Sequence, residues 1–370
     1  MPVLFGNLRA HYDAHRESID AAVRRTLESG WYVLGQEIAS FEREFAAYLG
    51  VRHCVGVGNG TDAIEVALRA LGVGAGDEVI TVSHTATFTA VGIAGAGARP
   101  VFVDIDEASY TMAPHGLARA VTAKTKAVVP VHLYGAPADL DAIDHALAGK
   151  IPIVEDVAQA TGAMLRGRRL GSIGTLGCFS FYPTKNLGAF GDGGAVTTND
   201  DALAERLRQI RNGGQVDRYL HAIPGVNSRL DEMQAAILRA QLPHLDAMNA
   251  RRREIAARYT SGLSGLSGLA LPPAEPADRR FVHHLYVVRS RARDALRAAL
   301  QERGIGAQVH YPIPAHRQPA FAADASGVVL PVTDRASQEV LSLPLYPELS
   351  NAEVDEVIAA VRDAVRAATG

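Results

Sequence analysis

Short runs of apolar, often β-branched residues alternate with helix-like segments between about residues 50 and 200. Each run predicts a buried strand, and segments such as 62–71 and 140–148 predict the helices between them. Strands that alternate with helices indicate an α/β fold with a mostly parallel sheet covered on both faces. The predicted strands are 53–57, 78–82, 100–105, 127–131, 151–156 and 178–181.

The pattern changes after Phe190, where Asp192-Gly193 precedes the apolar run 195–198. An Asp-Gly pair between two such runs is typical of a tight turn, so one antiparallel strand is expected in the sheet. Asn199 or Asp200 then caps a helix that extends to about residue 210. A second helix follows, and a third, longer one begins near residue 246.

The last third of the chain starts with a loop-like segment from residue 261 in which Ser-Gly-Leu occurs three times. Beyond it a strand, a helix and another strand are predicted at 284–288, 294–303 and 307–311. Ser350 and Glu353 form a capping box before the final helix. We therefore expect a large domain over residues 1–245 and a smaller C-terminal α+β domain over 246–370.

Composition narrows the class of function. The chain has 370 residues and a formal net charge of −3, which argues against nucleic acid or an anionic membrane as the main partner. No apolar stretch predicts a membrane span, and the first residues lack the pattern of a secretory signal. Cys54 and Cys178 lie in apolar contexts without disulfide or metal-site spacing. A cytoplasmic protein without a metal centre is therefore expected.

The stretch around Lys185 is the most informative. An apolar and aromatic run ends at Pro183, presents Lys185 and turns at the glycine-rich segment 188–194. A lysine at the end of a buried strand loses hydration, which favours the neutral amine that can form a Schiff base. The alternative is a solvated loop lysine, which is the common environment of this residue type.

A possible phosphate site lies at 58–62, between a predicted strand and a helix. Its glycines, Gly60 among them, permit close approach of an anion, and the helix start offers free N–H groups. Thr61 adds a hydroxyl donor. A plain strand-to-helix turn explains the segment equally well. A nicotinamide dinucleotide fingerprint fails, because threonine occupies the position of its last glycine.

A carboxylate, Asp156, ends another predicted strand, and Gln159 follows it. The carboxyl ends of parallel strands face the ligand crevice, where a buried carboxylate needs a cationic partner such as a protonated ring nitrogen. A simple helix cap by Asp156 is the alternative. Ser180 precedes Lys185 on its strand, so its hydroxyl could reach the same phosphate. Together these elements describe pyridoxal phosphate as the cofactor.

With these motifs, the chain resembles the DegT/DnrJ class of sugar aminotransferases, which are fold-type-I pyridoxal-phosphate enzymes. The resemblance covers nearly the full length and is most specific around Lys185. The segments that carry it are 31–35, 59–62, 155–159, 180–194, 227–232, 310–312 and 343–347.

The resemblance implies a role for each candidate residue. Lys185 would bind the cofactor as a Schiff base and move the proton, Asp156 would pair with the pyridine nitrogen, and Gln159 would contact the phenolic oxygen. Because the residue at the Asn227 position reaches into the neighbouring subunit, a homodimer is expected. The residues implied to hold the phosphate are Gly60, Thr61, Ser180 and, from the other subunit, Asn227.

The remaining candidates concern the ring stack and the substrate. The family usually places an aromatic ring over the cofactor at the position of Ala86, so either Ala86 packs there or Phe88 or His84 substitutes. His310 and Tyr311 are implied to face the sugar. Arg229 would lie near the shared site, where it could pair with a sugar carboxylate. It could equally be a helix-start arginine bound to backbone or to the other subunit.

The implied reaction is transfer of an amino group from glutamate to a nucleotide-linked keto sugar. The run 182–188 looks more like members that act on 3-keto sugars. Alternatives are carbon 4, a cyclitol ketone and a cofactor-binding relative that does not transaminate, such as a sensor. A dehydratase is disfavoured, because that subset has histidine in place of Lys185.

Overall fold

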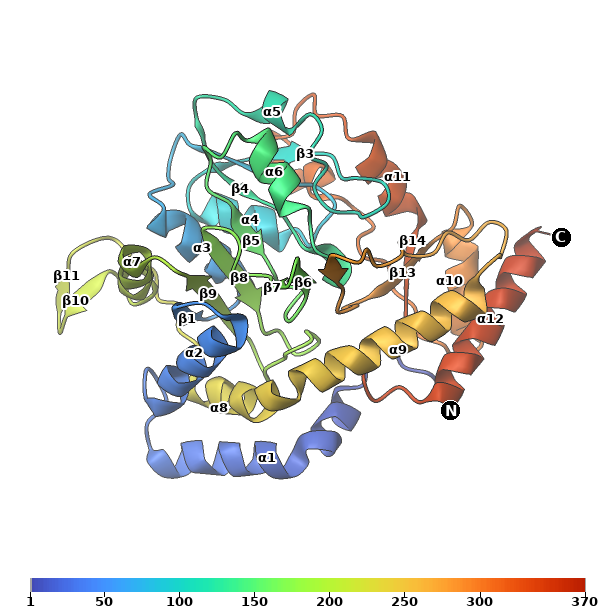
Figure 1. The fold of residues 1–370 in the computed structure, drawn as a ribbon, viewed down its shortest axis with the longest axis horizontal. Helices are drawn as coiled ribbons and strands as arrows, with labels where there is room; N and C mark the ends of the chain where they lie inside the picture. Colours follow the sequence, from blue (N-terminus) through green and yellow to red (C-terminus); the bar gives the residue numbers. More distant parts are fainter. Residues whose placement is uncertain (1, 370) are drawn as a thin grey trace.

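The computed structural model describes residues 2–369. Its centre is a mixed sheet in the order β1-β9-β8-β5-β4-β2-β3, in which two hydrogen-bonded groups of strands are joined by bridges between β4 and β5 (Figure 1). Only β9 in this sheet of described strands runs antiparallel to its neighbours, as predicted. The strands are β1 His53–Val57, β2 Glu78–Val82, β3 Arg99–Val103, β4 Thr125–Val129, β5 Val154–Asp156, β8 Leu176–Ser180 and β9 Gly194–Thr198.

Helices cover both faces of this sheet. Neighbouring residues of one strand, such as Cys178 and Phe179, belong to two different hydrophobic clusters because side chains alternate across a strand. One cluster includes α3 (Gly60–Ala70), α4 (Phe88–Gly95) and α7 (Asp201–Arg211). The other includes α2 (Gln36–Leu49), α6 (Leu140–Ala146) and α8 (Glu232–Gln241). The sheet is thereby buried between two helical layers.

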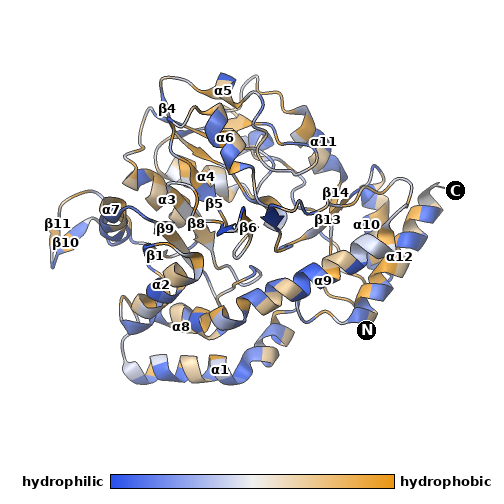
Figure 2. Cartoon of the chain, viewed as in Figure 1, coloured by the Kyte–Doolittle hydropathy of each residue, from blue (hydrophilic) through white to orange (hydrophobic). Residues whose placement is uncertain are grey.

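The C-terminal part has its own hydrophobic cluster, which Val3 joins from the start of the chain. It is built on the antiparallel pair β13 (Tyr286–Arg289) and β14 (Val340–Leu343). The helices around this pair show alternating polar and apolar faces (Figure 2). The division into two domains at residue 245 stays a proposal. The helices of this part are α9 Leu245–Leu263, α10 Arg293–Glu302, α11 Pro331–Glu339 and α12 Asn351–Thr369.

Shorter elements complete the chain. Helix α1 (Leu8–Ser29) runs beside α8 at the edge of the molecule, and the hairpin of β10 and β11 projects outward beside α7 (Figure 1). The other elements are α5 Leu117–Ala120, β6 Met164–Leu165, β7 Arg168–Arg169, β10 Gln215–Asp217, β11 Leu220–His221, β12 Arg279–Arg280 and the 3-10 turns Leu133–Gly135, Leu242–His244, Ala315–Arg317 and Pro319–Phe321.

The helix caps predicted from the sequence form in the structure. Asp200 caps α7 by accepting hydrogen bonds from two backbone N–H groups. Ser350 and Glu353 form the predicted capping box, in which the Glu353 N–H donates to the Ser350 hydroxyl at 3.2 Å. The Ser350 N–H and hydroxyl both donate to the Glu353 carboxylate.

One predicted strand does not form. Residues 307–311 make only an isolated bridge, in which Gln308 and Ser342 exchange backbone hydrogen bonds. Pro312 and Pro314 follow closely and have no N–H to continue a ladder. His310 instead binds the Ser342 hydroxyl through its Nδ1 at 2.9 Å. The segment therefore crosses the end of β14 and continues as a loop.

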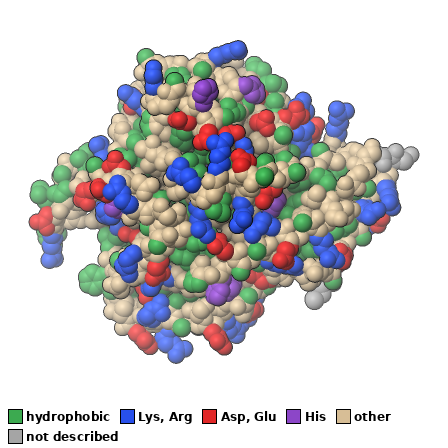
Figure 3. All heavy atoms as spheres, in the orientation of Figure 1, with side chains coloured by type: hydrophobic (Ala, Val, Ile, Leu, Met, Phe, Trp, Pro, Cys, Tyr) green, Lys and Arg blue, Asp and Glu red, His purple; other side chains and the backbone are tan. Residues whose placement is uncertain are grey.

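The surface carries acidic and basic side chains that lie next to one another across the face in Figure 3. Many of them form ion pairs, for example Arg258 with Asp355 at 2.6 Å. Among the helices that the structure describes, none is long and apolar enough to cross a membrane.

Candidate active site

The turn that follows β8 presents Lys185. The Lys185 N–H donates to the Tyr182 carbonyl at 2.8 Å, and the Ala189 N–H returns to the Phe181 carbonyl at 2.7 Å. A side chain at Gly188 would place its Cβ 2.4 Å from the Pro183 carbonyl oxygen, so only glycine fits this tight turn. The lysine is thus held on a rigid loop at the end of a core strand.

The electrostatics of Lys185 are those expected for a reactive amine. Its side chain is only partly exposed, and desolvation lowers its pKa to about 8 although the Asp156 charge acts in the opposite direction. A substantial fraction of the amine is therefore neutral near physiological pH. A neutral amine is the form that attacks a carbonyl and accepts a proton.

Asp156 ends β5 and is buried. The Thr89 hydroxyl donates to its Oδ2 at 2.8 Å, and the Ala158 N–H donates to its Oδ1 at 3.1 Å. Burial raises the pKa of Asp156, while these hydrogen bonds and the Lys185 charge oppose the rise. A cationic ring nitrogen beside it would favour the ionised carboxylate.

The neighbouring residue, Glu155, also stabilises the end of β5. Its buried carboxylate accepts the Nε2–H of His132 at 3.1 Å and backbone N–H groups of residues 171, 173 and 174. His132 carries its proton on Nε2, because its Nδ1 accepts the Ala138 N–H. The His132 N–H also donates to the Asp156 carbonyl at 3.0 Å. No local sequence pattern indicates that this pair would support Asp156.

Gln159 lies between the two halves of the molecule. Its Oε1 accepts the Tyr134 N–H at 2.8 Å, which orients the amide, and its Nε2 donates to the Tyr311 hydroxyl at 2.8 Å. The Tyr134 hydroxyl in turn donates to the His310 carbonyl. The structure therefore brings Gln159 next to Tyr311 and close to His310, although more than 150 positions separate them in the sequence.

The predicted phosphate site is a close junction between α3 and β8. Gly60 is the first residue of α3, and Asn59 caps the helix by accepting the Asp62 N–H at 2.9 Å. A Cβ at Gly60 would lie 2.6 Å from the Cβ of Ser180, so glycine is required where the two segments meet. Gly60, Thr61 and Ser180 thus lie at one helix N-terminus, which suits a phosphate group.

The three candidates for the ring stack differ in their environments. His84 is fully buried, and its ring nitrogens bind the Ser337 hydroxyl at 3.3 Å and the Tyr134 hydroxyl at 2.8 Å. Phe88 is 67% exposed at the start of α4. Ala86 is partly buried and precedes Thr89, which touches Asp156. Ala86 stays the predicted position beside the cofactor.

Asn227 and Arg229 lie on a loop beside the first turn of α3. Asn227 is exposed, and Arg229 donates to the Asn212 side chain at 3.0 Å. The residue between them, Ser228, is buried and donates to the Asp62 carboxylate at 2.6 Å. Neither predicted residue is among the described residues that line the cavity at Lys185 in the same chain. Ser228 instead ties their loop to the first turn of α3.

A cavity of about 550 Å³ adjoins Lys185, a size typical of small-molecule sites. Among the predicted site residues, Lys185 and His310 line it, and Tyr182 and Asn186 belong to the lysine loop. The sequence analysis did not identify the buried Arg252 and His284, or the N-terminal segment 4–8. A larger cavity of about 650 Å³ near Arg289 contains none of the candidate residues.

Comparison with known proteins identifies this arrangement. The model of the DegT/DnrJ/EryC1/StrS aminotransferase family matches residues 13–362. The chain belongs to this family. The fold and the class of reaction expected from the sequence are thereby confirmed, since the solved structures that it matches over most of their length are aminotransferases of the same architecture.

Individual family members are closely similar. The dTDP-3-amino-3,4,6-trideoxy-alpha-D-glucose transaminase of Streptomyces venezuelae is 50% identical over 98% of this chain and 96% of its own length. The UDP-N-acetyl-3-dehydro-alpha-D-glucosamine 3-aminotransferase of Acidithiobacillus ferrooxidans is 46% identical over 96% of both chains. The crystal structure of S. venezuelae DesV superposes with a TM-score of 0.96, at 49% identity and 98% coverage of both chains.

The cofactor expected from the sequence fits the family and the site. Solved structures of similar aminotransferases carry pyridoxal phosphate or its amine form, and family members depend on this cofactor. In this chain, a helix N-terminus that a Cβ would obstruct, a buried carboxylate and a desolvated lysine provide matching contacts. The individual roles of the site residues stay predictions.

Proposed function

We propose that the protein transfers an amino group from glutamate to carbon 3 of a nucleotide-linked keto sugar. The observation that carries the proposal is the Lys185 amine, which has a pKa lowered to about 8 and lines a cavity of about 550 Å³. Of the two named relatives, one is a transaminase named for a 3-amino sugar, and the other is a 3-aminotransferase named for a 3-dehydro sugar. Because one uses a dTDP sugar and the other a UDP sugar, the proposal covers the class rather than one nucleotide.

Lys185, Asp156 and the first turn of α3 would each contribute to this reaction. Bound pyridoxal phosphate provides the electron sink that stabilises negative charge on the carbon bearing the amine. The Nζ of Lys185 takes the proton from that carbon and returns it to the other side of the nitrogen, which a pKa near 8 suits. The Asp156 carboxylate keeps the ring nitrogen protonated, and the first turn of α3 holds the phosphate.

His310 and Tyr311 are proposed to form the wall that faces the sugar. Desolvation, followed by the Lys185 charge, lowers the pKa of His310 to about 4, so its ring is neutral at physiological pH. The ring stacks on Phe5, with 5.6 Å between centroids. A neutral imidazole beside an apolar ring supports binding of sugar hydroxyls rather than of a carboxylate.

The active unit is proposed to be a homodimer. Asn227 and Arg229 do not line the cavity at Lys185 in their own chain, which suits a role in the neighbouring site. The hairpin of β10 and β11 projects from the molecule and exposes Tyr219 and Leu220, and Trp31 and Tyr32 form another exposed apolar stretch (Figure 1). A second copy would bury these side chains.

The reaction is proposed to take place in the cytoplasm. Cys54 and Cys178 are both free and buried, which suits a reducing compartment.

A substrate panel tests the proposed reaction. The holoenzyme is incubated with glutamate and with 3-keto and 4-keto forms of dTDP- and UDP-linked sugars, and the products are located by mass spectrometry and NMR. We expect an amine at carbon 3, and no product with the Lys185→Ala variant. Amination of only 4-keto sugars or of a cyclitol ketone would overturn the choice of carbon or substrate class.

A further inference from the structure

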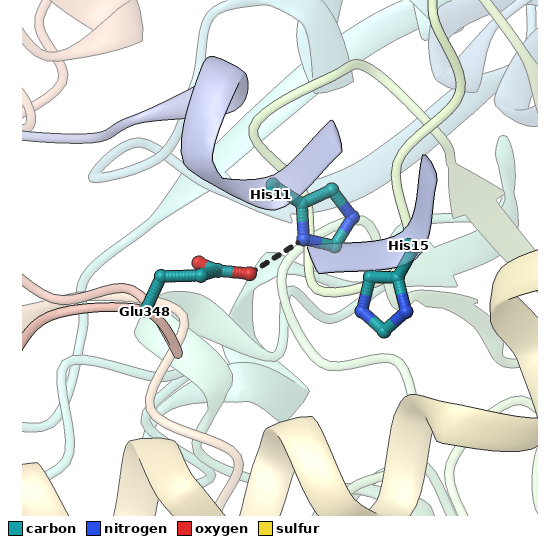
Figure 4. Close-up of side chains that lie close together, drawn as sticks. All are labelled: His11, His15 and Glu348. Carbon is teal, nitrogen blue, oxygen red and sulfur yellow. Dashed lines mark hydrogen bonds and ion pairs between the residues drawn. The ribbon is translucent and has the colours of Figure 1, made fainter. Parts of the chain in front are cut away.

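A group of imidazole and carboxylate side chains lies at the N-terminal wall of the Lys185 cavity, outside the catalytic constellation. His11 and His15 project from α1, and Glu348 approaches from the segment before α12 (Figure 4). One ligand atom from each of these three side chains lies within 4.8 Å of the other two. The His244 ring lies next to that of His15, with 4.9 Å between centroids.

The hydrogen bonds of Gln241 determine which nitrogen of His11 faces this group. The Gln241 amide nitrogen donates to the carbonyls of Gly188 and Ile237, so its Oε1 is an acceptor. That oxygen lies 2.6 Å from Nε2 of His11, and Nε2 must therefore carry a proton. The Nδ1 of a neutral His11 then has a lone pair that points toward Glu348.

The second ring nitrogen of His11 faces Glu348. Nδ1 of His11 lies 2.9 Å from the Glu348 carboxylate. A proton on Nδ1 satisfies this contact, and so does a metal ion bound by both groups.

The His15 ring distinguishes a metal ion from a proton alone. None of the hydrogen bonds found among the described residues uses this ring, and its position at a kink of α1 leaves it beside the rings of His11 and His244. A proton between His11 and Glu348 would leave the His15 ring unused. A metal ion would be bound by all three side chains.

We propose that Nδ1 of His11, the His15 ring and the Glu348 carboxylate bind a divalent transition-metal ion of the zinc class, with His244 within reach as a further ligand. Two imidazoles and a carboxylate are a ligand set found for Zn²⁺, and Gln241 provides the outer hydrogen bond that usually fixes a ligating histidine. Zinc–ligand bonds of about 2.0 to 2.2 Å require His15 to move inward by roughly 1.5 Å. The His15 ring has no hydrogen bond among the described residues that this movement would break.

The bound ion would connect three parts of the chain. It would join α1 to the segment before α12, and through His11 and Gln241 to the Gly188 carbonyl of the lysine loop. The site would therefore stabilise the N-terminal wall of the cavity. This inference does not depend on which sugar the enzyme aminates.

Equilibrium dialysis of the chelator-treated holoenzyme against Zn²⁺ alone tests the site, with the bound metal measured by mass spectrometry. We expect one bound ion per chain in the wild type. His15→Asn should weaken binding by about tenfold or more, because it removes one of the ligands. His115→Asn is the matched control at an exposed histidine away from the group, and it should bind as the wild type does.

A second measurement separates ligation from nonspecific binding. Co²⁺ in place of Zn²⁺ should give visible absorption bands of a low-coordinate site in the wild type and in His115→Asn. These bands should be absent in His15→Asn and in Glu348→Gln. Zinc binding of equal strength in His15→Asn and wild type, or no binding by the wild type at micromolar Zn²⁺, would overturn the proposal.

Discussion

The Lys185 side chain is held in an environment that opposes its charge. Desolvation lowers its pKa from an ordinary value of 10.5 to about 8, so the folded protein binds this proton more weakly than the unfolded chain does. Below pH 8 the folded protein therefore contains a desolvated ammonium group at Lys185, which would be more stable in water. The property that makes the amine reactive should also reduce the stability of the cofactor-free protein.

Replacing Lys185 with methionine should therefore stabilise the cofactor-free protein at pH 7. A shift from 10.5 to about 8 corresponds to a gain of up to about 3 kcal/mol in the free energy of unfolding. The gain should be full below pH 8 and should shrink as pH rises from 8 toward 10.5. Urea unfolding at pH 7 and pH 10 measures it, with the exposed Lys150→Met as control. An equal gain at both pH values would contradict the environment described for Lys185.

Asp156→Asn should leave the fold intact and slow turnover by about a hundredfold or more, because a neutral amide does not keep the ring nitrogen protonated. The variant and an exposed control, Asp144→Asn, are compared by kcat with the cofactor bound. Because Thr89 and Ala158 bind the Asp156 side chain, the asparagine keeps a similar position. Turnover within a few-fold of wild type would show that Asp156 is only a structural residue.

At the scale of single residues, the sequence located Lys185, Asp156 and Gly60 because each stands beside a strand end or a helix start that local pattern reveals. It could not show that Gln159 donates to the Tyr311 hydroxyl, or that Ser228 binds Asp62. These contacts join distant segments, and no local pattern encodes them.

The positions of the elements around the site depend on close contacts between backbone segments, such as that between α3 and β8. Gly60→Ala would place a Cβ 2.6 Å from that of Ser180 and displace the first turn of α3 from β8. We expect pyridoxal phosphate to bind about tenfold or more weakly, because the N–H groups that face the phosphate move with the turn. Gly74→Ala is the matched control, since nothing lies within 4 Å of its added Cβ.

Fluorescence titration of the cofactor-free variants with pyridoxal phosphate gives the two affinities. Thermal unfolding of the same samples shows whether Gly60→Ala damages the fold as a whole. Unchanged affinity in Gly60→Ala would mean that α3 does not hold the phosphate.

Most strands were predictable because buried parallel strands are continuous apolar runs bounded by turns. The segment 307–311 has a similar composition but forms only one bridge, since its ability to pair depends on the prolines and on β14 rather than on its own pattern. The N-terminal segment 4–8 was also not predicted, because it follows a bridge between Val3 and Ile305 and lines the cavity together with residues 345–348, far from it in sequence.

At the scale of the whole molecule, the proposed shared site predicts complementation between two inactive proteins. Lys185→Ala lacks the amine, and Asn227→Asp places a negative charge where Asn227 of the partner subunit would meet the phosphate. A mixed dimer has one site with both residues intact. Activity should therefore appear after the two variants are unfolded together and refolded, and not after either is refolded alone.

Sedimentation of the wild type provides the accompanying measurement, with a dimer as the expected species. Lys185→Ala refolded together with Asp156→Asn is the matched control, because both residues act in the site of their own chain and no site of the mixed dimer has both intact. If the Asn227→Asp variant alone is as active as the wild type, the site does not depend on the second subunit.

The cavity beside Lys185 has a consequence for the order in which the protein matures during synthesis. Its walls come from residues 4–11, from 182–186 and from 345–348, so they span almost the whole chain. A ribosome that has released the first 300 residues has already released every strand of the central sheet, and with them the cofactor-binding elements. Residues 345–348 are still inside the exit tunnel or untranslated, so one wall of the cavity is missing. The nascent chain therefore completes the strand ends proposed to hold the cofactor before it completes the cavity beside Lys185.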